Sequence, residues 1–515
     1  MPFIASVEID QRQNFIQQAD TLREMVGASR MIGFSVRQAR EDLKGFRGVT
    51  LFWPVSGVLR FYAEDHAKLG GFLVRYRRSL EAVSLGCSIA VLPTTGDLDH
   101  DLTELEGRIR ARKDANASPV PIPSTPFFAP CSILPQLPAT DWNPGAKEVE
   151  RRLRSWQAIE RESARNEALE DSESPVHIPR RRLAQIDQLV AAGDSRSYIG
   201  FIKGDVDGLG KLLTTLKFEK LAKEFPDLSK RVAPGLPPAA AAALVFTEEL
   251  QSVLELAVAE AYRNVPAEKR PPNQPLPYRH LLIAGDDLFI IARRDIALTM
   301  AHDIEASFSR LGYKSSVIQA ALRCAGAPRL SISLGVLFAK YGYPFDASFD
   351  LAEDLLRSAK SDGRVPTENA EGGIDFHWLG DSGRPRLTAI RRSQFFYLDD
   401  SGDEMHLTTL PWACSGAKAY LDAADVLRGV PRRKLKQLDE ITRLGRELSD
   451  LAYLAWRQGL QGQEKGVDTA LGLIHWPGVP EGGKPSLWRP SQSTKRRGWE
   501  TCFNDLVQLT EVMDS

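Results

Sequence analysis

Hydrophobic positions in the first 117 residues alternate between the spacing of strands and that of helices. Short apolar runs at 3–9 and 87–92 are typical of buried strands, and two more strands flank the turn-forming residues 54–57. Apolar residues at helical spacing occupy 16–26, and a second helix is expected from His66. The order strand, helix, strand, strand, helix, strand predicts a ferredoxin-like unit.

The same order returns after residue 196. Strands are predicted at 198–202, 281–283, 288–292 and 330–338, and the helices between them include an alanine-rich segment at 239–262. The pattern predicts an α+β fold with two ferredoxin-like units in one chain. Because this fold supports many unrelated activities, function has to be inferred from sites.

Two segments interrupt the pattern and a third follows it. The proline-rich residues 118–138 show no periodicity and mark a domain boundary. Residues 147–173 are dense in Glu and Arg at spacings that pair across a helical turn, which predicts a helical linker. From residue 416 onward we expect a mainly helical domain. Its expected core positions are Leu421, Leu427, Leu435, Leu438, Ile441 and Leu444.

Composition narrows the class of protein. The chain has 515 residues, with 66 Lys and Arg against 67 Asp and Glu, so its net charge is −1 and no global field attracts nucleic acid or membrane. Its five cysteines include no C-x-x-C pair, which argues against a disulfide framework or a zinc ribbon. Neither a signal peptide nor a membrane-spanning run is present, so we expect a cytoplasmic protein with no membrane partner.

The first candidate site follows the strand at 198–203. Asp205 and Asp207 are two residues apart, so in an extended segment their carboxylates face one side. Carboxylate oxygens suit Mg²⁺ or Mn²⁺, which also bind phosphate oxygens. Gly208 and Gly210 open the next helix, where free amide groups can meet a triphosphate.

The second candidate site lies about eighty residues later. Asp286 and Asp287 occupy the tip of a hairpin between two apolar runs, where their charge is costly unless a cation compensates it. In this fold the hairpin lies beside the first strand, so we expect Asp286 and Asp287 to join Asp205 and Asp207 in a two-metal phosphoryl-transfer site. Either motif alone is often an ordinary turn, but both at strand ends of one unit favour catalysis.

These motifs resemble those of the large, polymerase-like subunit of type III CRISPR effector complexes, the Cas10 family, called Cmr2 in one subtype. The family's catalytic palm carries a Gly-Asp-x-Asp strand end and a Gly-Gly-Asp-Asp hairpin, which correspond here to 204–207 and 284–287. The match extends over nearly the whole chain, since other segments look like further parts of the family pattern. These segments are 22–31 in the first unit, 330–335 and 352–360 in the second, and 407–441.

The resemblance implies a domain plan and an activity. It implies two palm domains of the cyclase and polymerase type, a linker that includes a degenerate zinc-ribbon-like segment, and a carboxyl-terminal helical domain. The activity would be cyclic oligoadenylate synthesis, in which two ATP molecules bind between the palms and a 3′-hydroxyl attacks an α-phosphate. The expected domains are 1–117 for the non-catalytic palm, 118–195 for the linker, 196–400 for the catalytic palm and 401–515 for the helical domain.

The resemblance also assigns residues. Asp205 and Asp286 would be the primary ligands of two Mg²⁺ or Mn²⁺ ions, with Asp207 and Asp287 in support. The first palm has 54–57 at the equivalent turn and no acidic pair, so it would hold the second nucleotide without metals. The expected nucleotide contacts are Gly204, Val206, Gly208, Gly210, Lys211, Gly285, Lys360 and, in the first palm, Ser29.

Three departures from the family pattern change these expectations. Ala284 replaces the first hairpin glycine, so the turn has to tolerate a Cβ there. Leu134 stands where the second cysteine of the C-x-x-C segment at 131–139 would be, so we expect no zinc. The chain begins with the first palm, and its His-Asp pairs at 100–101 and 302–303 are scattered, so we expect a form without the HD nuclease domain.

Partners and rival functions also follow from the resemblance. We expect a repeat-handle-binding subunit, a small helical subunit, guide RNA and target RNA, with partner subunits supplying most of the positive charge. Basic clusters at 180–182, 432–436 and 495–497 are candidate RNA contacts, although such clusters are more often solvated. The rivals are a catalytically silent scaffold subunit and a stand-alone nucleotide cyclase of the GGDEF type.

Overall fold

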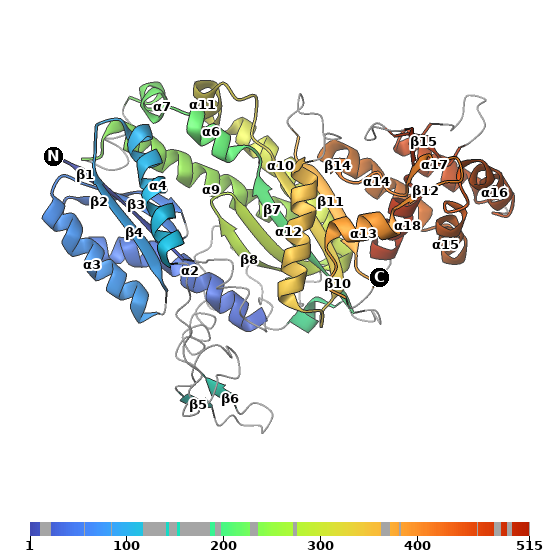
Figure 1. Cartoon of the computed structure of the whole chain (residues 1–515), viewed down its shortest axis with the longest axis horizontal. Coiled ribbons are helices and arrows are strands. Elements are labelled where there is room, and N and C mark those ends of the chain that lie inside the picture. The colour runs from blue at the N-terminus through green and yellow to red at the C-terminus, as the bar shows by residue number, and fades with distance from the viewer. Residues whose placement is uncertain are drawn as a thin grey trace.

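The computed structural model has an elongated shape, with the first ferredoxin-like unit at one end, the second in the middle and the carboxyl-terminal helices at the other end (Figure 1). The described residues are 1–10, 22–55, 57–83, 85–116, 141–143, 152–154, 186–190, 197–226, 235–270, 276–361, 371–380, 383–460, 462–477, 486–491 and 497–513.

The first unit has the predicted order of elements. These are β1 (Phe3–Ile9), α2 (Leu22–Leu43), β2 (Val49–Val55), β3 (Val58–Ala63), α3 (His66–Ala82) and β4 (Cys87–Pro93). The strands pair antiparallel in the order β2-β3-β1-β4, which confirms the ferredoxin-like topology. On one face Phe61 of β3 packs against Phe72 and Tyr76 of α3, with ring centroids 4.7 and 5.9 Å away.

A further helix, α4 (Leu98–Asn116), covers the opposite face of this sheet and was not predicted. Two ion pairs join the sheet to α4. Arg60 of β3 contacts Glu106 at 2.7 Å, and Glu8 of β1 contacts Lys113 at 2.6 Å. The sequence did hold a signal, because four buried residues of α4 recur every three or four positions. They are Leu98, Leu102, Leu105 and Ile109.

The second unit repeats this topology around a larger sheet. Its elements are β7 (Tyr198–Val206), α6 (Leu209–Thr215), α7 (Phe218–Glu224), α9 (Pro238–Asn264), β8 (Tyr278–Ala284), β9 (Asp287–Arg293), α10 (Arg294–Lys314), α11 (Ser316–Ala325), β10 (Ile332–Lys340) and α12 (Phe345–Ser361). The inner order β10-β7-β9-β8 matches β4-β1-β3-β2 of the first unit. Two later strands, β11 (Gly373–Trp378) and β14 (Trp412–Ala413), extend the sheet beyond β10.

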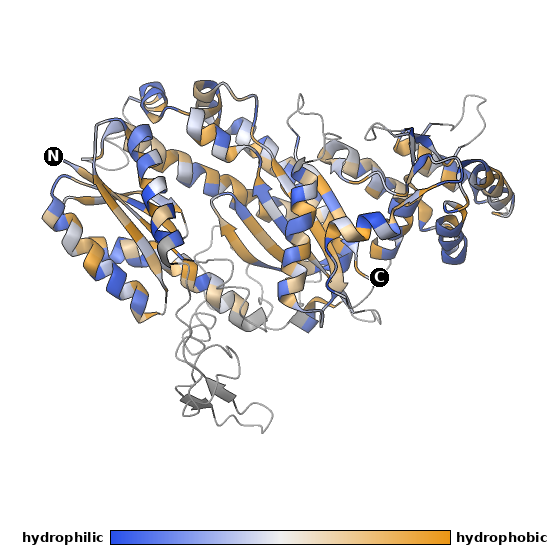
Figure 2. Ribbon diagram, viewed as in Figure 1, coloured by the Kyte–Doolittle hydropathy of each residue, from blue (hydrophilic) through white to orange (hydrophobic). Residues whose placement is uncertain are grey.

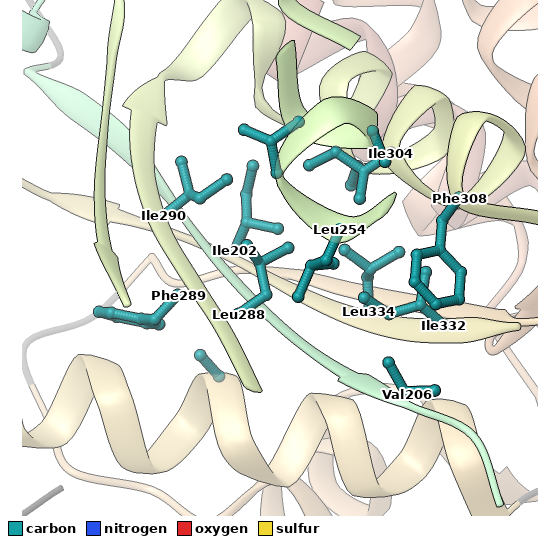
Figure 3. Packing of buried hydrophobic residues seen from close by; sticks show 14 of the residues in the cluster. Ile202, Val206, Leu254, Leu288, Phe289, Ile290, Ile304, Phe308, Ile332 and Leu334 are labelled. Atoms are coloured by element: carbon teal, nitrogen blue, oxygen red, sulfur yellow. The ribbon is translucent and has the colours of Figure 1, made fainter. Parts of the chain in front are cut away.

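Helices cover both faces of the second sheet because its strands are hydrophobic almost throughout (Figure 2). On one face Ile202, Ile290 and Leu334 pack with residues of α9 and α10 (Figure 3). On the other face Gly335 lets α12 approach, since a Cβ there would lie 2.4 Å from the backbone nitrogen of Leu356. The helix α12 is thereby held over the strand end that carries the acidic motif.

In the described part of the linker, the secondary structure differs from the prediction. Residues 152–154, expected in a helix, form the short strand β6 (Arg152–Arg154), which pairs with β5 (Asp141–Asn143). A single 3₁₀ turn at Ile186–Leu189 precedes the second unit. The rest of the predicted helix at 147–173, the segment at 131–139 and the basic cluster at 180–182 lie outside the described residues.

The carboxyl-terminal region is helical, as predicted, but it also contains a small sheet. Its elements are α13 (Leu387–Gln394), β12 (Phe396–Leu398), β13 (Glu404–His406), α14 (Cys414–Leu427), α15 (Arg432–Ile441), α16 (Arg446–Gln458), α17 (Glu464–Leu473), β15 (Arg489–Pro490), β16 (Gly498–Glu500) and α18 (Phe503–Met513). The sheet order is β12-β13-β16-β15, so the expected boundary at 400/401 falls inside the β12–β13 hairpin. None of the helices in the described part of the chain could cross a membrane.

The expected core of this region is correct at four positions. Leu421, Leu427, Leu435 and Leu438 are buried, and Ile441 is partly buried against the same cluster. The prediction for Leu444 was wrong, since its side chain is 49% exposed at the end of α15.

A buried carboxyl group in α18 ties this region together and gives a testable prediction. Asp505 accepts hydrogen bonds from the hydroxyls of Thr408 and Thr409 and from the Thr409 N–H. Burial raises the pKa of Asp505 to about 6. Because this pKa is higher in the folded chain than in the unfolded chain, the ionised carboxylate costs stability above pH 6, and the cost disappears as the pH falls toward 4.

We expect wild type to gain stability relative to Asp505→Asn, which does not titrate, as the pH falls from 7.5 to 4.5. The gain should reach about 2 kcal/mol in unfolding free energy at pH 4.5. Urea unfolding of both proteins at each pH measures it. Parallel pH profiles for the two proteins would contradict the assignment.

Candidate functional site

The acidic hairpin is a two-residue turn in which glycine takes the strained position. Ala284 and Asp287 pair across the strands, which leaves Gly285 and Asp286 at the centre of the turn. The positive φ, 65°, falls on Gly285, whereas Ala284 ends β8 in ordinary backbone geometry. Glycine at the first central position is typical of a type II′ turn. Ala284 is therefore compatible with this hairpin.

The turn faces the first unit across a cavity of about 430 Å³. A Cβ on Gly285 would lie 2.9 Å from Val55 Cγ1, so the tip of one hairpin touches the end of β2 in the other unit. Asp286 lines the cavity beside Gly285. The first unit contributes Trp53, Val55, Val58, Arg60 and part of α4, and the second contributes Leu209, Leu213, Phe246, Thr247 and Leu250.

Asp205 and Asp287 lie on the face of the sheet that α12 covers. Asp205 in β7 is the cross-strand partner of Asp287 in β9, so two like charges stand side by side. Lys360 of α12 forms an ion pair with Asp205. Lys203, only 1% exposed, places its Nζ 3.8 Å from Asp287 Oδ1 and 3.6 Å from Glu353 Oε2. Two lysines thus supply the compensating charge.

Asp207 is held by the neighbouring strand end. Its carboxylate accepts a hydrogen bond from the Ser331 hydroxyl at 2.9 Å, and its N–H donates to the Ser331 carbonyl at 2.9 Å. Burial raises the pKa of Asp207, although hydrogen bonds from Ser333 and Ser331 oppose the shift. Burial, aided by Lys203, lowers the pKa of Lys360 to about 8.

The four predicted aspartates therefore meet at one end of the sheet but on two sides of it. Asp205 and Asp287 lie on the side of α12, Asp207 is held by Ser331 beyond the end of β7, and Asp286 lies at the cavity between the units. The oxygen donors suit Mg²⁺ or Mn²⁺ in kind. In this conformation no three His, Cys, Asp or Glu side chains of the described residues converge on a metal position, and Lys360 lies against Asp205.

The predicted nucleotide contacts divide into three groups. Gly208 and Gly210 have open space where a Cβ would lie, and Lys211 is exposed. Gly204 and Val206 are buried in the sheet, where the Val206 side chain packs in the hydrophobic core and Gly204 leaves room for Leu288 and Leu334. Ser29 does not line the cavity, because its hydroxyl donates to the Leu281 carbonyl and joins α2 to β8. A contact of Gly204, Val206 or Ser29 with nucleotide stays a prediction.

Three residues near the site were missed in the sequence. Lys203 interrupts an otherwise apolar strand, and such a lysine is a signal for a buried charge network. Glu353 precedes Lys360 by seven residues, which places both on one face of α12. Gln251, on α9, accepts a hydrogen bond from the Gly285 N–H at 2.8 Å, and nothing in the local pattern predicts it.

The two His-Asp pairs have local structural roles. Asp101 is fully buried in α4 and accepts hydrogen bonds from the backbone and hydroxyl of Thr95. His302 and Asp303 lie in α10 of the other unit, with Nδ1 and Oδ1 2.9 Å apart. The absence of an HD nuclease domain from the protein stays a prediction.

Comparison with known proteins identifies the domain that carries the four aspartates. Residues 198–365 match the family model of the second palm domain of Cas10/Cmr2. A comparison with curated proteins finds no match.

Solved structures share the fold. Csm1 of T. onnurineus has a TM-score of 0.50 at 12% identity, over 99% of this chain and 69% of that chain. A Csm1–Csm4 cassette in complex with cA4 has a TM-score of 0.52 at 13% identity, over 92% and 69% of the two chains. The cassette in complex with one ATP has a TM-score of 0.51 at 13% identity over the same shares. At such identities the likeness shows the fold alone.

The topology and the acidic hairpin define a protein with two palm domains, of which only the second carries the acidic motifs. This second palm is that of the Cas10/Cmr2 family. The expected likeness to Cas10/Cmr2 is thus confirmed for the second palm domain, and the fold of the chain is similar to that of Csm1.

Removing Lys203 tests the charge network. In Lys203→Met, Asp287 and Glu353 would face each other with no buried cation, so we expect unfolding free energy to fall by about 3 kcal/mol or more. Lys223→Met, at an exposed position of α7, is the control. Adding Glu353→Gln to Lys203→Met should restore part of the loss. Equal stability of the two single variants in urea unfolding would contradict this account.

Proposed function

We propose that this chain is the large subunit of a type III CRISPR effector complex and a metal-dependent nucleotidyltransferase that makes cyclic oligoadenylate from ATP. The observation that carries the proposal is the Gly285–Asp286 turn at the edge of a cavity between two palms, in a palm of the Cas10/Cmr2 family. The Csm1–Csm4 structures in complex with cA4 and with ATP support the choice of substrate and product by analogy.

Asp205 and Asp286 are the proposed primary ligands of Mg²⁺ or Mn²⁺. When bound, these ions lower the pKa of an attacking 3′-hydroxyl and stabilise charge on the α-phosphate and the departing pyrophosphate. Asp207 and Asp287 support the site, since Ser331 and Lys203 already hold them. Lys360 neutralises Asp205 until a nucleotide binds and then contacts phosphate.

The nucleotides are proposed to occupy the cavity between the palms. Its volume of about 430 Å³ falls within the usual range of ligand sites. Apolar side chains such as Trp53 and Phe246 can pack against a base, and the open backbone at Gly208 and Gly210 can approach phosphate. The first palm forms one wall, and no metal role is assigned to it because its hairpin lacks acids.

Assembly with other subunits is part of the proposal. Several of the similar Csm1 structures are complexes with Csm4, and we propose an equivalent repeat-handle-binding partner, a small helical subunit, guide RNA and target RNA for this chain. In two of the basic clusters a described arginine already pairs with an acid, since Arg432 contacts Glu511 with its Nε at 2.8 Å and Arg497 lies 3.5 Å from Asp403. This pairing fits a subunit whose partners supply most of the charge for RNA.

The scaffold alternative rests on one observation. Lys360 and Lys203 already compensate Asp205 and Asp287, so the charges can be balanced without metal. The family match argues against a stand-alone nucleotide cyclase of the GGDEF type, since the second palm matches the model of Cas10/Cmr2. We expect no DNA cleavage by this chain.

Mass spectrometry of the products tests the function. The protein is purified with its native partners and target RNA and incubated with ATP and Mn²⁺ or Mg²⁺. We expect adenylate oligomers from wild type and a loss of at least about a hundredfold in Asp286→Ala/Asp287→Ala. If RNA-loaded wild type binds ATP but forms no product, the protein is a scaffold subunit and the proposed enzymatic activity is wrong. Mixed ATP and GTP separates the cyclase alternative by base identity.

Lys360→Met tests the exchange of the ammonium group for a metal. Without nucleotide, we expect Mn²⁺ to bind about fivefold more tightly than in wild type, since a partly exposed ion pair contributes about 1 kcal/mol. Product formation should nevertheless be slower, because the phosphate contact is lost. Electron paramagnetic resonance of free Mn²⁺ measures the affinity. Unchanged or weaker Mn²⁺ binding would show that Lys360 does not compete for Asp205.

A further inference from the structure

The turn that carries Asp286 is braced from outside the sheet by a residue of α9. Gln251 Oε1 accepts a hydrogen bond from the Gly285 N–H at 2.8 Å, and Gln251 Nε2 donates to the Ile283 carbonyl at 3.1 Å. One side chain therefore bonds to the backbone on two sides of Ala284. Together these two hydrogen bonds fix both the position and the orientation of the turn.

The orientation of the amide follows from its partners. The Gly285 N–H can only donate, so it requires the amide oxygen. The amide nitrogen then has two donors, which reach the Ile283 carbonyl and Glu255 Oε1, the latter at 2.7 Å. Glu255 lies one helical turn after Gln251 on α9 and so holds the amide from behind. These three contacts of the amide agree with one orientation.

The other side of the turn is held by the first palm. Val55 Cγ1 lies 2.9 Å from the position that a Cβ of Gly285 would take, so the turn cannot move toward β2. The helix α9 packs against β2 as well as α10, and therefore spans the two units (Figure 1). Gln251 and Val55 together confine the Gly285–Asp286 turn between α9 and the first palm.

We propose that Gln251 is a positioning residue that sets the Asp286 carboxylate for catalysis through the Gly285 turn. The inference rests on the proposed nucleotidyltransferase function. Gln251 itself makes no contact with the reacting atoms. Its loss leaves the fold intact but allows the turn that carries Asp286 to move, and the Asp286 charge has to be aligned in the transition state.

Three variants separate the contacts. Gln251→Leu removes both hydrogen bonds at similar volume, and Gln251→Glu keeps an acceptor for the Gly285 N–H but loses the donors. Ser252→Ala, at the adjacent exposed position of α9, is the matched control. Hydrogen exchange of peptides covering 281–289 reports the turn directly, and it does not depend on activity.

For Gln251→Leu we expect exchange at the turn to be about tenfold faster and Mn²⁺ binding to weaken. The rate of product formation, kcat, should fall about tenfold with little change in KM. Gln251→Glu should lie between Gln251→Leu and wild type in hairpin exchange. Ser252→Ala should match wild type in every measurement.

The outcomes distinguish the two proposals. If Gln251→Leu matches Ser252→Ala in hairpin exchange and Mn²⁺ affinity, the positioning role is overturned, whatever wild type produces. If hydrogen exchange of the hairpin is faster in Gln251→Leu but wild type makes no product, then Gln251 does hold the turn, and the proposed enzymatic function is wrong. A fall in thermal stability of Gln251→Leu that accounts for all the changes would assign Gln251 to folding, and circular dichroism of the variants measures it.

Discussion

The compensation of acidic charge at the end of a hydrophobic sheet is the constraint on which this site depends. Asp205 and Asp287 face each other across β7 and β9, and like charges so placed destabilise a sheet. Lys203 and Lys360 reach them from β7 and from α12. The position of α12 is therefore an electrostatic requirement as well as a packing one, and the close approach at Gly335 makes it possible.

The two units show how one topology comes to serve two roles. Both sheets have the same inner order, and both place a hairpin at the cavity. The second hairpin presents Gly285 and Asp286, whereas the first ends in Val55 and makes a hydrophobic contact. Because a wall of packed side chains needs no compensating cation, the first unit could lose acids without loss of fold and still shape the cavity.

Sequence patterns predicted the strands and the order of both units well, because buried strands between turn residues have a strong signal. They ended the first strand of the second unit at residue 202 or 203, whereas β7 extends to Val206, because Gly204 and Asp205 are residues that favour turns. The small sheet of the carboxyl-terminal region was missed because its strands have only two or three residues. Side-chain contacts such as Ser29 with Leu281, or Gln251 with Gly285, join distant segments and leave no local pattern.

Under the proposed function, the charges require metal and nucleotide to bind together. A triphosphate near Asp205, Asp286 and Asp287 would be repelled, and two lysines cannot balance both the carboxylates and the phosphates. Divalent ions brought with the nucleotide would remove the repulsion and release Lys360 from Asp205 to the phosphates. Burial and the charge of Lys203 lower the pKa of Lys360 to about 8, and a phosphate beside Lys360 would favour its protonated form.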